Sequence, residues 1–405
     1  SELFSLRGEQ RFGEVTLALD IGHRNKTMRS YGSYSWGGTS TADTDVDVTT
    51  ISPRLMWNTP LAGMDNRLTV GADWGDWSYT NNTLGTGGAF SLAESGNQNN
   101  RAIYFRDELR LVSGTRLSLG ARRENVRQDD EDSLVPRPKE SVEHHLSAHE
   151  LAFQQDLISG FSAYGRIGRS FRVATIDENR CTPWMPVCVP LLKPQQSHDR
   201  ELGMQWNGKG ASFRAGLFNM DINNEIHYNG IDGSNMNLPP TRHRGLELEG
   251  KVAIGSTLDL AARYTRTQAR FREGTYTGFD IDTFAFFSAD IAGKDVPLVP
   301  KDRIGLNLGW QATIATRLTA NVSYVGSQRY DNDQANLFRE MPSYTVAHIK
   351  LNHDFGAWRL AAGINNLLDK AYYSYGVTNI SLTPSRFNAY PEDRRNAYVS
   401  AEYRF

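Results

Sequence analysis

The chain lacks any long run of apolar residues. Of its 405 residues, 39% are hydrophobic and 22% are charged. No stretch approaches the roughly 18 consecutive apolar residues that a membrane-spanning helix requires, so a helical membrane protein is excluded. The sequence also lacks Pro- or Ser-rich linkers, charge blocks and any shift from strand-like to helix-like patterning. We therefore expect a single domain over residues 1–405.

Net charge and cysteine are also scarce. A formal charge of −2 gives no sign of the concentrated basic surface that nucleic-acid binding requires, so no nucleic-acid partner is predicted. The two cysteines, Cys181 and Cys188, lie close together in the segment CTPWMPVC. In a reducing cytosol such a pair hints at metal or redox chemistry, whereas in a secreted chain a small disulfide-closed loop is favoured.

No signal peptide begins the chain, because SELFSLRGEQ has no basic region followed by an apolar core. We therefore expect the numbering to start in a mature or truncated product.

What the sequence does contain is alternation of apolar and polar residues from end to end. It is clearest in residues 15–21, 67–74, 246–252, 258–265, 318–324 and 399–405. Strict alternation predicts strands with two differently solvated faces, which a soluble β-sandwich also has. Two features favour a membrane barrel: the interleaved residues are heavily charged, as a wet lumen requires, and the strands reach roughly ten residues, enough to cross a bilayer at a tilt.

The connections alternate in length as well. Short turns are expected at 113–114, 207–210, 255–256 and 355–356, and long loops at 24–44, 80–99, 128–144, 173–195, 270–296 and 375–393. Short turns on one side and long loops on the other are typical of outer-membrane barrels. Four tryptophans flank short turns, where a periplasmic aromatic belt would lie: Trp57, Trp206, Trp310 and Trp358. The sequence therefore predicts an all-β, transmembrane antiparallel β-barrel in the outer membrane of a Gram-negative bacterium.

We place about 17 strands, which conflicts with the even number that bacterial barrels of this type have. The predicted ranges are 2–10, 13–24, 45–57, 66–79, 100–112, 115–127, 145–157, 160–172, 196–207, 211–222, 240–253, 256–269, 297–311, 316–329, 343–355, 357–373 and 394–405. A free first edge would leave unpaired backbone groups in lipid, at several kcal/mol each. Either the first segment is not a strand or, as we prefer, upstream strands are missing from a barrel of about 22.

Several segments in the second half of the chain carry a family resemblance. Ser170–Glu178 is similar to an FRAP-T-x-x-E region, and Lys193–Gly203 to a segment with the pattern kPE-x-S…E-x-G. Arg242–Glu249 matches a G-x-E-x-E strand, Asn365–Tyr372 is close to NLfDkxY, and the chain ends in YRF. Together these motifs resemble the C-terminal barrel of TonB-dependent outer-membrane receptors. Residues 1–169 fit by strand pattern alone.

The resemblance implies a 22-stranded barrel closed by an N-terminal plug. Such receptors bind a scarce nutrient, for example an iron–siderophore, haem or cobalamin, and the TonB complex supplies energy. The plug and the TonB box are not in this sequence, so contact with TonB is expected through a region outside it. Val399, Tyr403 and Phe405 share one face of the last strand and resemble the signal that the barrel-assembly machinery reads. Ordinary lipid-facing aromatics are the alternative.

A search for chemistry gives no enzyme prediction and no cofactor. No G-x-S-x-G elbow lies between a strand and a helix. His144, His145 and His149 form the densest histidine group, but their spacing does not bring metal ligands together, so a solvated loop is favoured. The DNDQ stretch at 331–334 lacks the Gly and Glu of an EF-hand and is predicted to be a surface loop.

Ligand contacts are expected from the outer loops and the upper lumen. Aromatic and apolar loop residues suited to stacking on a flat chelate are Tyr31, Tyr34, Trp36, Trp184, Met185, Tyr228, Phe284, Phe286 and Phe287. Packing of loop on loop is an equal alternative for each. Five arginines are suited to an anionic chelate, namely Arg172, Arg242, Arg244, Arg394 and Arg395. They equally suit ion pairs with lumen carboxylates such as Glu201, Glu247 and Glu249.

Three functional hypotheses follow. The leading one is a TonB-dependent receptor for an iron chelate in contact with outer-membrane lipid. The second is a passive 16-stranded porin that begins near residue 13. The third, a barrel enzyme or adhesin, has no positive residue evidence.

Overall fold

The computed structural model describes residues 1–405 except 35–36, 90, 112, 133–139, 180–190, 230–233, 281–282, 284, 379–386 and 405. Its elements are one 3-10 helix, η1 (Ile176–Asn179), and 23 strands: β1 (Glu2–Phe12), β2 (Val15–Ser33), β3 (Thr39–Asn58), β4 (Asp65–Thr86), β5 (Leu92–Arg110), β6 (Thr115–Asp132), β7 (Glu140–Asp156), β8 (Phe161–Arg172), β9 (Gln195–Gly208), β10 (Ala211–Asn223), β11 (Ile226–Asn229), β12 (Ser234–Asn237), β13 (Thr241–Ile254), β14 (Leu258–Phe271), β15 (Thr275–Asp280), β16 (Ala285–Asp290), β17 (Asp302–Gln311), β18 (Thr316–Val325), β19 (Tyr344–Phe355), β20 (Trp358–Asn365), β21 (Tyr373–Thr378), β22 (Phe387–Pro391) and β23 (Asn396–Tyr403). Among the described residues, no helix is long and apolar enough to cross a membrane.

Seventeen of these strands belong to one antiparallel sheet, and the others form the separate hairpins β11–β12, β15–β16 and β21–β22. The predicted fold class and strand number are therefore confirmed. Every residue of β1 and of β23 is exposed. The additional upstream strands stay a prediction.

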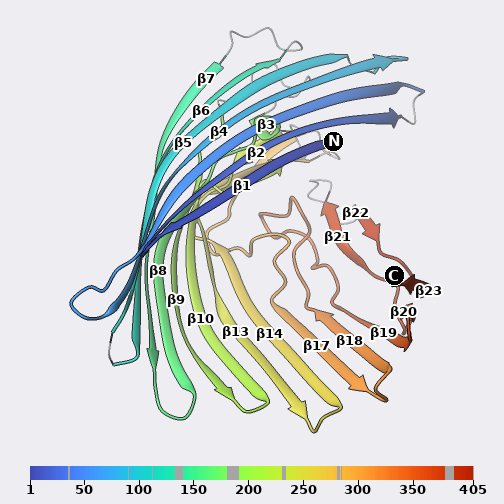
Figure 1. Ribbon diagram of the computed structural model, residues 1–405. Coiled ribbons are helices and arrows are strands. Elements are labelled where there is room, and N and C mark those ends of the chain that lie inside the picture. Colours follow the sequence, from blue (N-terminus) through green and yellow to red (C-terminus); the bar gives the residue numbers. More distant parts are fainter. Residues whose placement is uncertain are drawn as a thin grey trace. The chain divides into compact units, whose positions relative to one another are not determined.

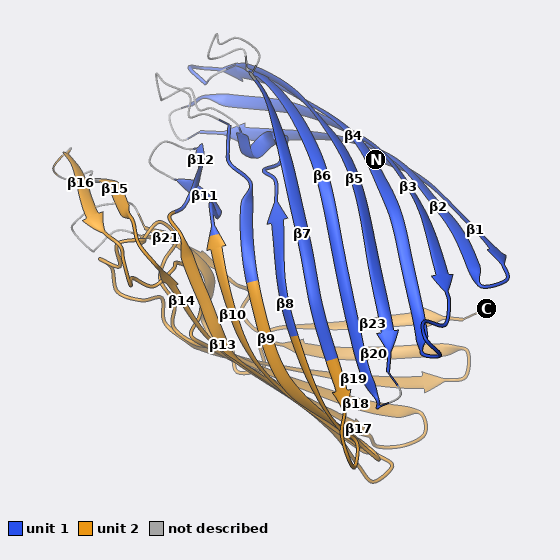
Figure 2. Ribbon diagram, turned by 90° about the vertical axis from the view of Figure 1, so that its left-hand side faces the viewer, with its two compact units in different colours: residues 1–153, 166–198, 223–238 blue, residues 154–165, 199–222, 239–405 orange. Residues whose placement is uncertain are grey.

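The chain divides into two compact units, coloured separately in Figure 2. Unit 1 holds residues 1–153, 166–198 and 223–238, and unit 2 holds residues 154–165, 199–222 and 239–405. Within unit 1, β1 to β6 lie side by side, each paired with its neighbour in the chain (Figure 1). Within unit 2, β13, β14, β17, β18, β19, β20 and β23 pair in that order. Both units are therefore built from antiparallel hairpins.

The strands of unit 1 run much further than the sequence predicts. Residues 24–44 and 80–99, expected as long loops, mostly extend the hairpins β2–β3 and β4–β5. Polar side chains hold the first extension together across the strands: Asn25 donates to Asp47 at 3.0 Å and Thr27 to Asp45 at 2.7 Å. Because both faces are polar there, apolar–polar alternation does not mark these residues as strand.

The strands have one exposed apolar face and one polar face. Residues opposite one another in a pair share a face, so Val70 lies beside Phe105, and Ala72 beside Ile103. Ile103 is 66% exposed and Val70 46%. In unit 2 the same face holds Leu306, 41% exposed, opposite Val322, which is not buried either. A continuous apolar surface of this kind on paired strands fits the lipid-facing side of a membrane barrel.

Ion pairs link neighbouring side chains on the polar face. In unit 1, Arg122 contacts Asp73 and, at 2.7 Å, Glu124. In unit 2, Arg263 lies 3.1 Å from Glu249 and Arg359 lies 2.8 Å from Asp354. These pairs fit the charged residues that the sequence interleaves with the apolar ones.

The tryptophans lie at the ends of strands, beside short turns. Trp57, Trp310 and Trp358 are 43%, 47% and 51% exposed, and the Trp206 indole donates to the Ser159 carbonyl at 3.1 Å. Two of the short turns need a left-handed residue, supplied by Gly210 (φ +78°) and Gly255 (φ +63°). This placement matches the predicted aromatic belt.

The apolar face gives a direct test. We predict that Val322→Arg lowers the free energy of unfolding in phospholipid vesicles by about 2–4 kcal/mol, because it places a charge in lipid. Ser323→Arg, one residue further along on the polar face, is the matched control and costs far less. Denaturant titration of both variants measures the difference, and equal losses would contradict the assignment of the faces.

Candidate functional site

The aromatic residues predicted to contact a ligand lie on separate hairpins. Tyr31 is in β2 rather than in a loop, and is 76% exposed, while Tyr34 follows that strand with its hydroxyl 3.4 Å from Ser40 Oγ. Tyr228 in β11 is 52% exposed and Phe286 in β16 is 72% exposed. Phe287 lies next to it in β16. These side chains have the accessibility that ligand contact requires, and their role stays a prediction.

Several predicted positions lie outside the described residues. They are Trp36, Trp184, Met185, Phe284, the cysteines Cys181 and Cys188, and Phe405. Their proposed roles in ligand contact, disulfide formation and barrel assembly stay predictions. Of the assembly signal, Val399 is 80% exposed and Tyr403 46%, and the Tyr403 ring lies 4.9 Å from that of Trp358.

Arg172 closes the turn that follows β8. Its guanidinium lies 2.7 Å from Glu178, which also accepts the Thr175 N–H at 2.9 Å. Burial opposes ionisation of Glu178, but these donors outweigh it and lower the pKa of the carboxyl. The turn packs on β5 and β6: Gln128 donates to the Ala174 carbonyl, and a Cβ at Gly96 would lie 2.3 Å from Ile176. Arg172 therefore has a structural partner different from the lumen glutamates considered above.

Arg394 also has a carboxylate partner. It contacts Asp369 with two nitrogens, at 3.0 and 2.7 Å, and the Arg395 N–H donates to the same carboxylate at 3.0 Å. These donors hold the pKa of Asp369 well below its usual value. Asn366 completes the corner by bonding both the N–H and the carbonyl of Lys370. The motif NNLLDK therefore builds a corner in the chain after β20.

Arg242 and Arg244 have partners other than the lumen glutamates expected for them. Arg242 lies 2.7 Å from Asp221, and Arg244 donates to the amide oxygen of Gln268. Neither uses the predicted partners Glu247 and Glu249, because the register of β13 places those residues on the opposite face.

The histidine group lies in a strand, which corrects the prediction of a solvated loop. His144, His145 and His149 belong to β7, where period two turns His144 away from the other two. His145 Nδ1 lies 2.8 Å from the Asn125 side-chain oxygen. Within the described part of the chain, no group of three or more His, Cys, Asp or Glu residues is placed to hold a metal ion.

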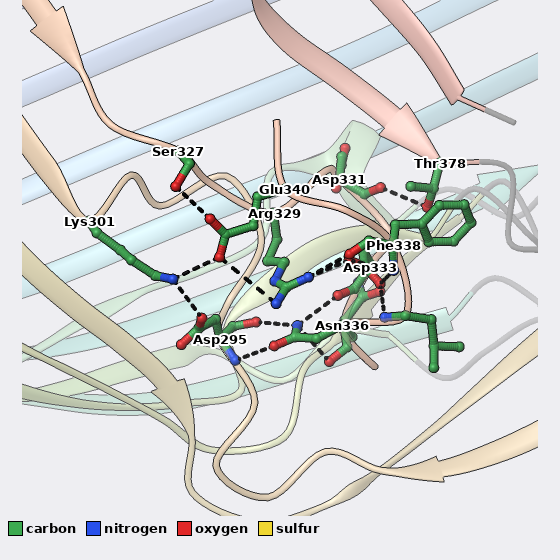
Figure 3. Close-up of polar contacts among 12 residues, drawn as sticks. Asp295, Lys301, Ser327, Arg329, Asp331, Asp333, Asn336, Phe338, Glu340 and Thr378 are labelled. Carbon is green, nitrogen blue, oxygen red and sulfur yellow. Dashed lines mark hydrogen bonds and ion pairs between the residues drawn. The ribbon is translucent and has the colours of Figure 1, made fainter. Parts of the chain in front are cut away.

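Unit 2 contains a polar cluster that the sequence does not reveal (Figure 3). Lys301 lies 2.7 Å from Glu340 and 3.5 Å from Asp295, and Arg329 lies 3.9 Å from Glu340. Pairing with Glu340 raises the pKa of Lys301, and Lys301 and Ser327 lower the pKa of Glu340. A cavity of about 360 Å³ is lined by Asp295, Lys301, Arg329 and Glu340, together with Arg266 and Arg270. The cavity combines four cationic side chains with two carboxylates and is of the size that small ligands occupy.

The DNDQ stretch forms the buried centre of the loop beside this cavity, so the predicted surface loop is wrong. Asp333 is 2% exposed and Gln334 is fully buried. The Asp333 carboxylate accepts the Leu337 N–H at 2.7 Å and the Phe338 N–H at 3.4 Å, and Arg329 lies 3.8 Å away. Backbone donors within the loop therefore replace the water that would otherwise solvate this carboxylate. No spacing in the sequence signals such a turn.

Comparison with known proteins identifies the class of barrel. A family model described as TonB dependent receptor-like, beta-barrel, matches residues 3–367. The ferrioxamine receptor of Yersinia enterocolitica is 24% identical over 321 residues, which are 75% of this chain and 40% of that protein.

Solved structures show the same fold. The ferric citrate transporter FecA, in its unliganded form, has a TM-score of 0.79 at 18% identity, over 98% of this chain and 60% of that one. The copper transporter OprC has a TM-score of 0.76 at 13% identity, over 100% of this chain and 65% of that one. The chain thus spans less than two thirds of the length of each of these relatives.

Asp333 gives a prediction about pH. Burial outweighs the backbone hydrogen bonds and raises its pKa from 3.8 to about 6. The folded protein therefore holds this proton more tightly than the unfolded chain, so stability falls as pH rises from about 4 to about 6 and is constant above. We expect Asp333→Asn to remove this fall, on the order of 2–3 kcal/mol, as measured by thermal unfolding across that range.

Asp333→Ala is the companion variant. It leaves the N–H groups of Leu337 and Phe338 without their acceptor, so we expect it to be about 1–3 kcal/mol less stable than Asp333→Asn at pH 7. A fall with pH that persists in the Asn variant would contradict the role given to Asp333.

Proposed function

The chain belongs to the TonB-dependent receptor family, as a β-barrel member, and we propose that it forms part of a receptor that takes up a ferric chelate. The proteins of this family are receptors and transporters of the Gram-negative outer membrane, not enzymes. The observation that carries the proposal is the relationship to a ferrioxamine receptor over 75% of the chain. A siderophore complex of iron is therefore the proposed ligand, with haem or cobalamin as alternative cargo.

Two features of the described residues support ligand capture. Exposed aromatic side chains on hairpins, Tyr31, Tyr228 and Phe286, offer flat apolar surfaces for the organic part of a chelate. The cavity beside Lys301 and Arg329 offers guanidinium and ammonium groups to its anionic oxygens. We propose that the aromatic side chains and the cavity each contact the ligand, and that Trp36 and Trp184, which lie outside the described residues, contribute further contacts.

We also propose how the receptor obtains energy and how it is inserted into the membrane. The chain spans 40% of the ferrioxamine receptor, so energy supply by the TonB complex is proposed to act through a region outside these residues. Insertion by the barrel-assembly machinery is proposed to use Val399, Tyr403 and Phe405. The passive-porin alternative is not favoured, because the matching family is one of energy-dependent receptors.

The ligand is testable by direct binding. Purified receptor in detergent is titrated with ferric trihydroxamate, ferric catecholate and ferric citrate complexes and with each metal-free ligand. We expect one ferric class to bind with a Kd in the micromolar range or tighter, and its metal-free form to bind more weakly. A folded receptor that binds none of the ferric chelates would refute the proposed ligand class.

The aromatic contacts give a sharper prediction. Tyr31→Ala, Tyr228→Ala and Phe286→Ala are each expected to weaken binding by roughly 3- to 10-fold, from the lost stacking of about 0.5–1.5 kcal/mol. Phe213→Ala is the matched control, because that ring is 47% exposed on the apolar face of β10. If the control weakens binding as much as the three hairpin variants, the assigned contacts are wrong.

A further inference from the structure

We infer that the Ala72 carbonyl, at a break in the sheet, accepts a hydrogen bond from a hydroxylated acyl chain of the membrane. The break lies where Pro53 of β3 faces Ala72 of β4, within unit 1. The inference rests on the proposed membrane location of the barrel, but not on the identity of the transported ligand.

Pro53 lies in the interior of a sheet, where proline is rare. Its strand, β3, pairs with β2 on one side and with β4 on the other, so β3 is not an edge strand. Proline has no N–H to donate, and in sheets it is otherwise confined to edges, strand ends and bulges. The other proline within the described strands, Pro391, is the last residue of β22. Pro53 therefore interrupts a ladder that its neighbours require.

The interruption is on the side of β4. Pairing with β2 is continuous, whereas pairing with β4 stops after Ile51 and resumes at Arg54. The register on either side of this gap sets Pro53 opposite Ala72, so the Ala72 carbonyl lacks the N–H that residue 53 would donate. No side chain of the described residues donates to it either. An acceptor without a partner is costly in hydrocarbon.

A shallow groove of about 700 Å³ lies beside this carbonyl. Its lining residues on the outward face are apolar except Gln10, and they are Gly8, Leu17, Leu19, Pro53, Leu55 and Val70. A side chain at Gly8 would meet nothing within 4 Å, so the groove is open there. Leu17 and Val70 are 45% and 46% exposed. The groove is therefore suited to an apolar chain.

The position of the break suits a hydroxyl near the head of that chain. Trp74, two residues beyond Ala72 on the same face, is 57% exposed, and the next outward residue is Asp76. A tryptophan at such a boundary lies at the membrane interface. Two residues span about 7 Å along a tilted strand, so Ala72 lies at the depth of the first few carbons of an acyl chain.

A hydroxyl is the donor that fits these surroundings. It is neutral, so it enters hydrocarbon without the cost of burying a charge, and its O–H donates directly to a carbonyl. A chain without a hydroxyl fills the groove but leaves the Ala72 carbonyl unpartnered. Water that reaches the break from the polar face is the plain alternative. In that case the receptor would not distinguish the two chains.

The test uses three neutral maltoside amphiphiles with the same tetradecanoyl chain. One chain is plain, one carries a hydroxyl on its third carbon, and one carries a hydroxyl next to its far end. Each is titrated into the receptor purified in detergent, and native mass spectrometry reports occupancy. We expect the chain hydroxylated near its head to bind roughly 2- to 10-fold more tightly than either of the others, which is the effect of one hydrogen bond.

Two variants separate the carbonyl from the groove. Pro53→Val restores an N–H opposite Ala72, so we expect it to abolish the preference for the hydroxyl and to raise the temperature of thermal unfolding. Leu55→Ala is the matched control, because it removes apolar lining and leaves the break in place. We expect it to weaken binding of all three amphiphiles equally and to keep the preference.

A readout on the unaltered chain keeps the test decisive if Pro53→Val does not fold. With carbon-13 in alanine carbonyls and nitrogen-15 in aspartate, NMR peaks arise from the pairs Ala42–Asp43, Ala72–Asp73 and Ala289–Asp290. We expect the Ala72–Asp73 peak to shift with the chain hydroxylated near its head and not with the plain chain.

Three outcomes would each overturn the inference: equal binding of the three amphiphiles, a preference that persists in folded Pro53→Val, or an Ala72 carbonyl peak that does not move. Ferric-chelate binding is measured on the same samples, so failure of the proposed transport function is seen separately.

Discussion

The hydrogen-bonding needs of a backbone in hydrocarbon govern the rest of this structure. No water reaches the lipid-facing peptide groups, so each N–H and C=O must find its partner on a neighbouring strand. Long antiparallel hairpins with one-to-one register meet that need, as in the 19 paired residues between β2 and β3. Because successive side chains of a strand point to opposite faces, one set then faces lipid and the other faces water. Apolar exposure on Ile103 and ion pairing at Arg122 are thus two results of a single constraint.

The polar face follows different rules. Many of its carboxylates and guanidiniums form ion pairs inside the sheet, as Arg122 does with Asp73 and Glu124, so these charges are compensated while the surface stays polar. Loops then fold against the polar side and become small cores of their own. Ala174 and Val126 in unit 1 and Tyr330 and Met341 in unit 2 are almost fully buried, although each lies in or beside a connection rather than in a conventional hydrophobic core. Such loop cores let polar segments hold fixed positions.

The alternation of apolar and polar residues predicts the strands and their two faces. It does not predict strand extensions or buried loops, which depend on a particular backbone geometry. Strand number and face assignment are readable because lipid imposes an apolar residue at every second position, as at Leu306 and Leu308. The extension of β2 beyond Arg24 is not readable, since Thr27 and Asp45 stabilise it through a polar pair that looks like a loop. The burial of Asp333 is equally invisible, because its partners are main-chain N–H groups that any sequence supplies. The sequence leaves open whether Arg172 and Arg394 contact a ligand or form ion pairs, and the structure supplies the carboxylate partners, Glu178 and Asp369.

This division explains why fold and ligand are separable in such a barrel. A ferric citrate transporter and a copper transporter share the fold at 18% and 13% identity with this chain. Lipid constrains composition on the apolar face, but it does not reach the hairpins that carry Tyr31, Tyr228 and Phe286. The hairpin that carries Tyr31 is held by polar cross-strand pairs, such as that of Thr27 with Asp45. These contacts do not depend on which side chains lie at the tip of the hairpin. Ligand chemistry is therefore free to change there without disturbing the membrane fit, and the residues that select a chelate must be sought where the lipid pattern ends.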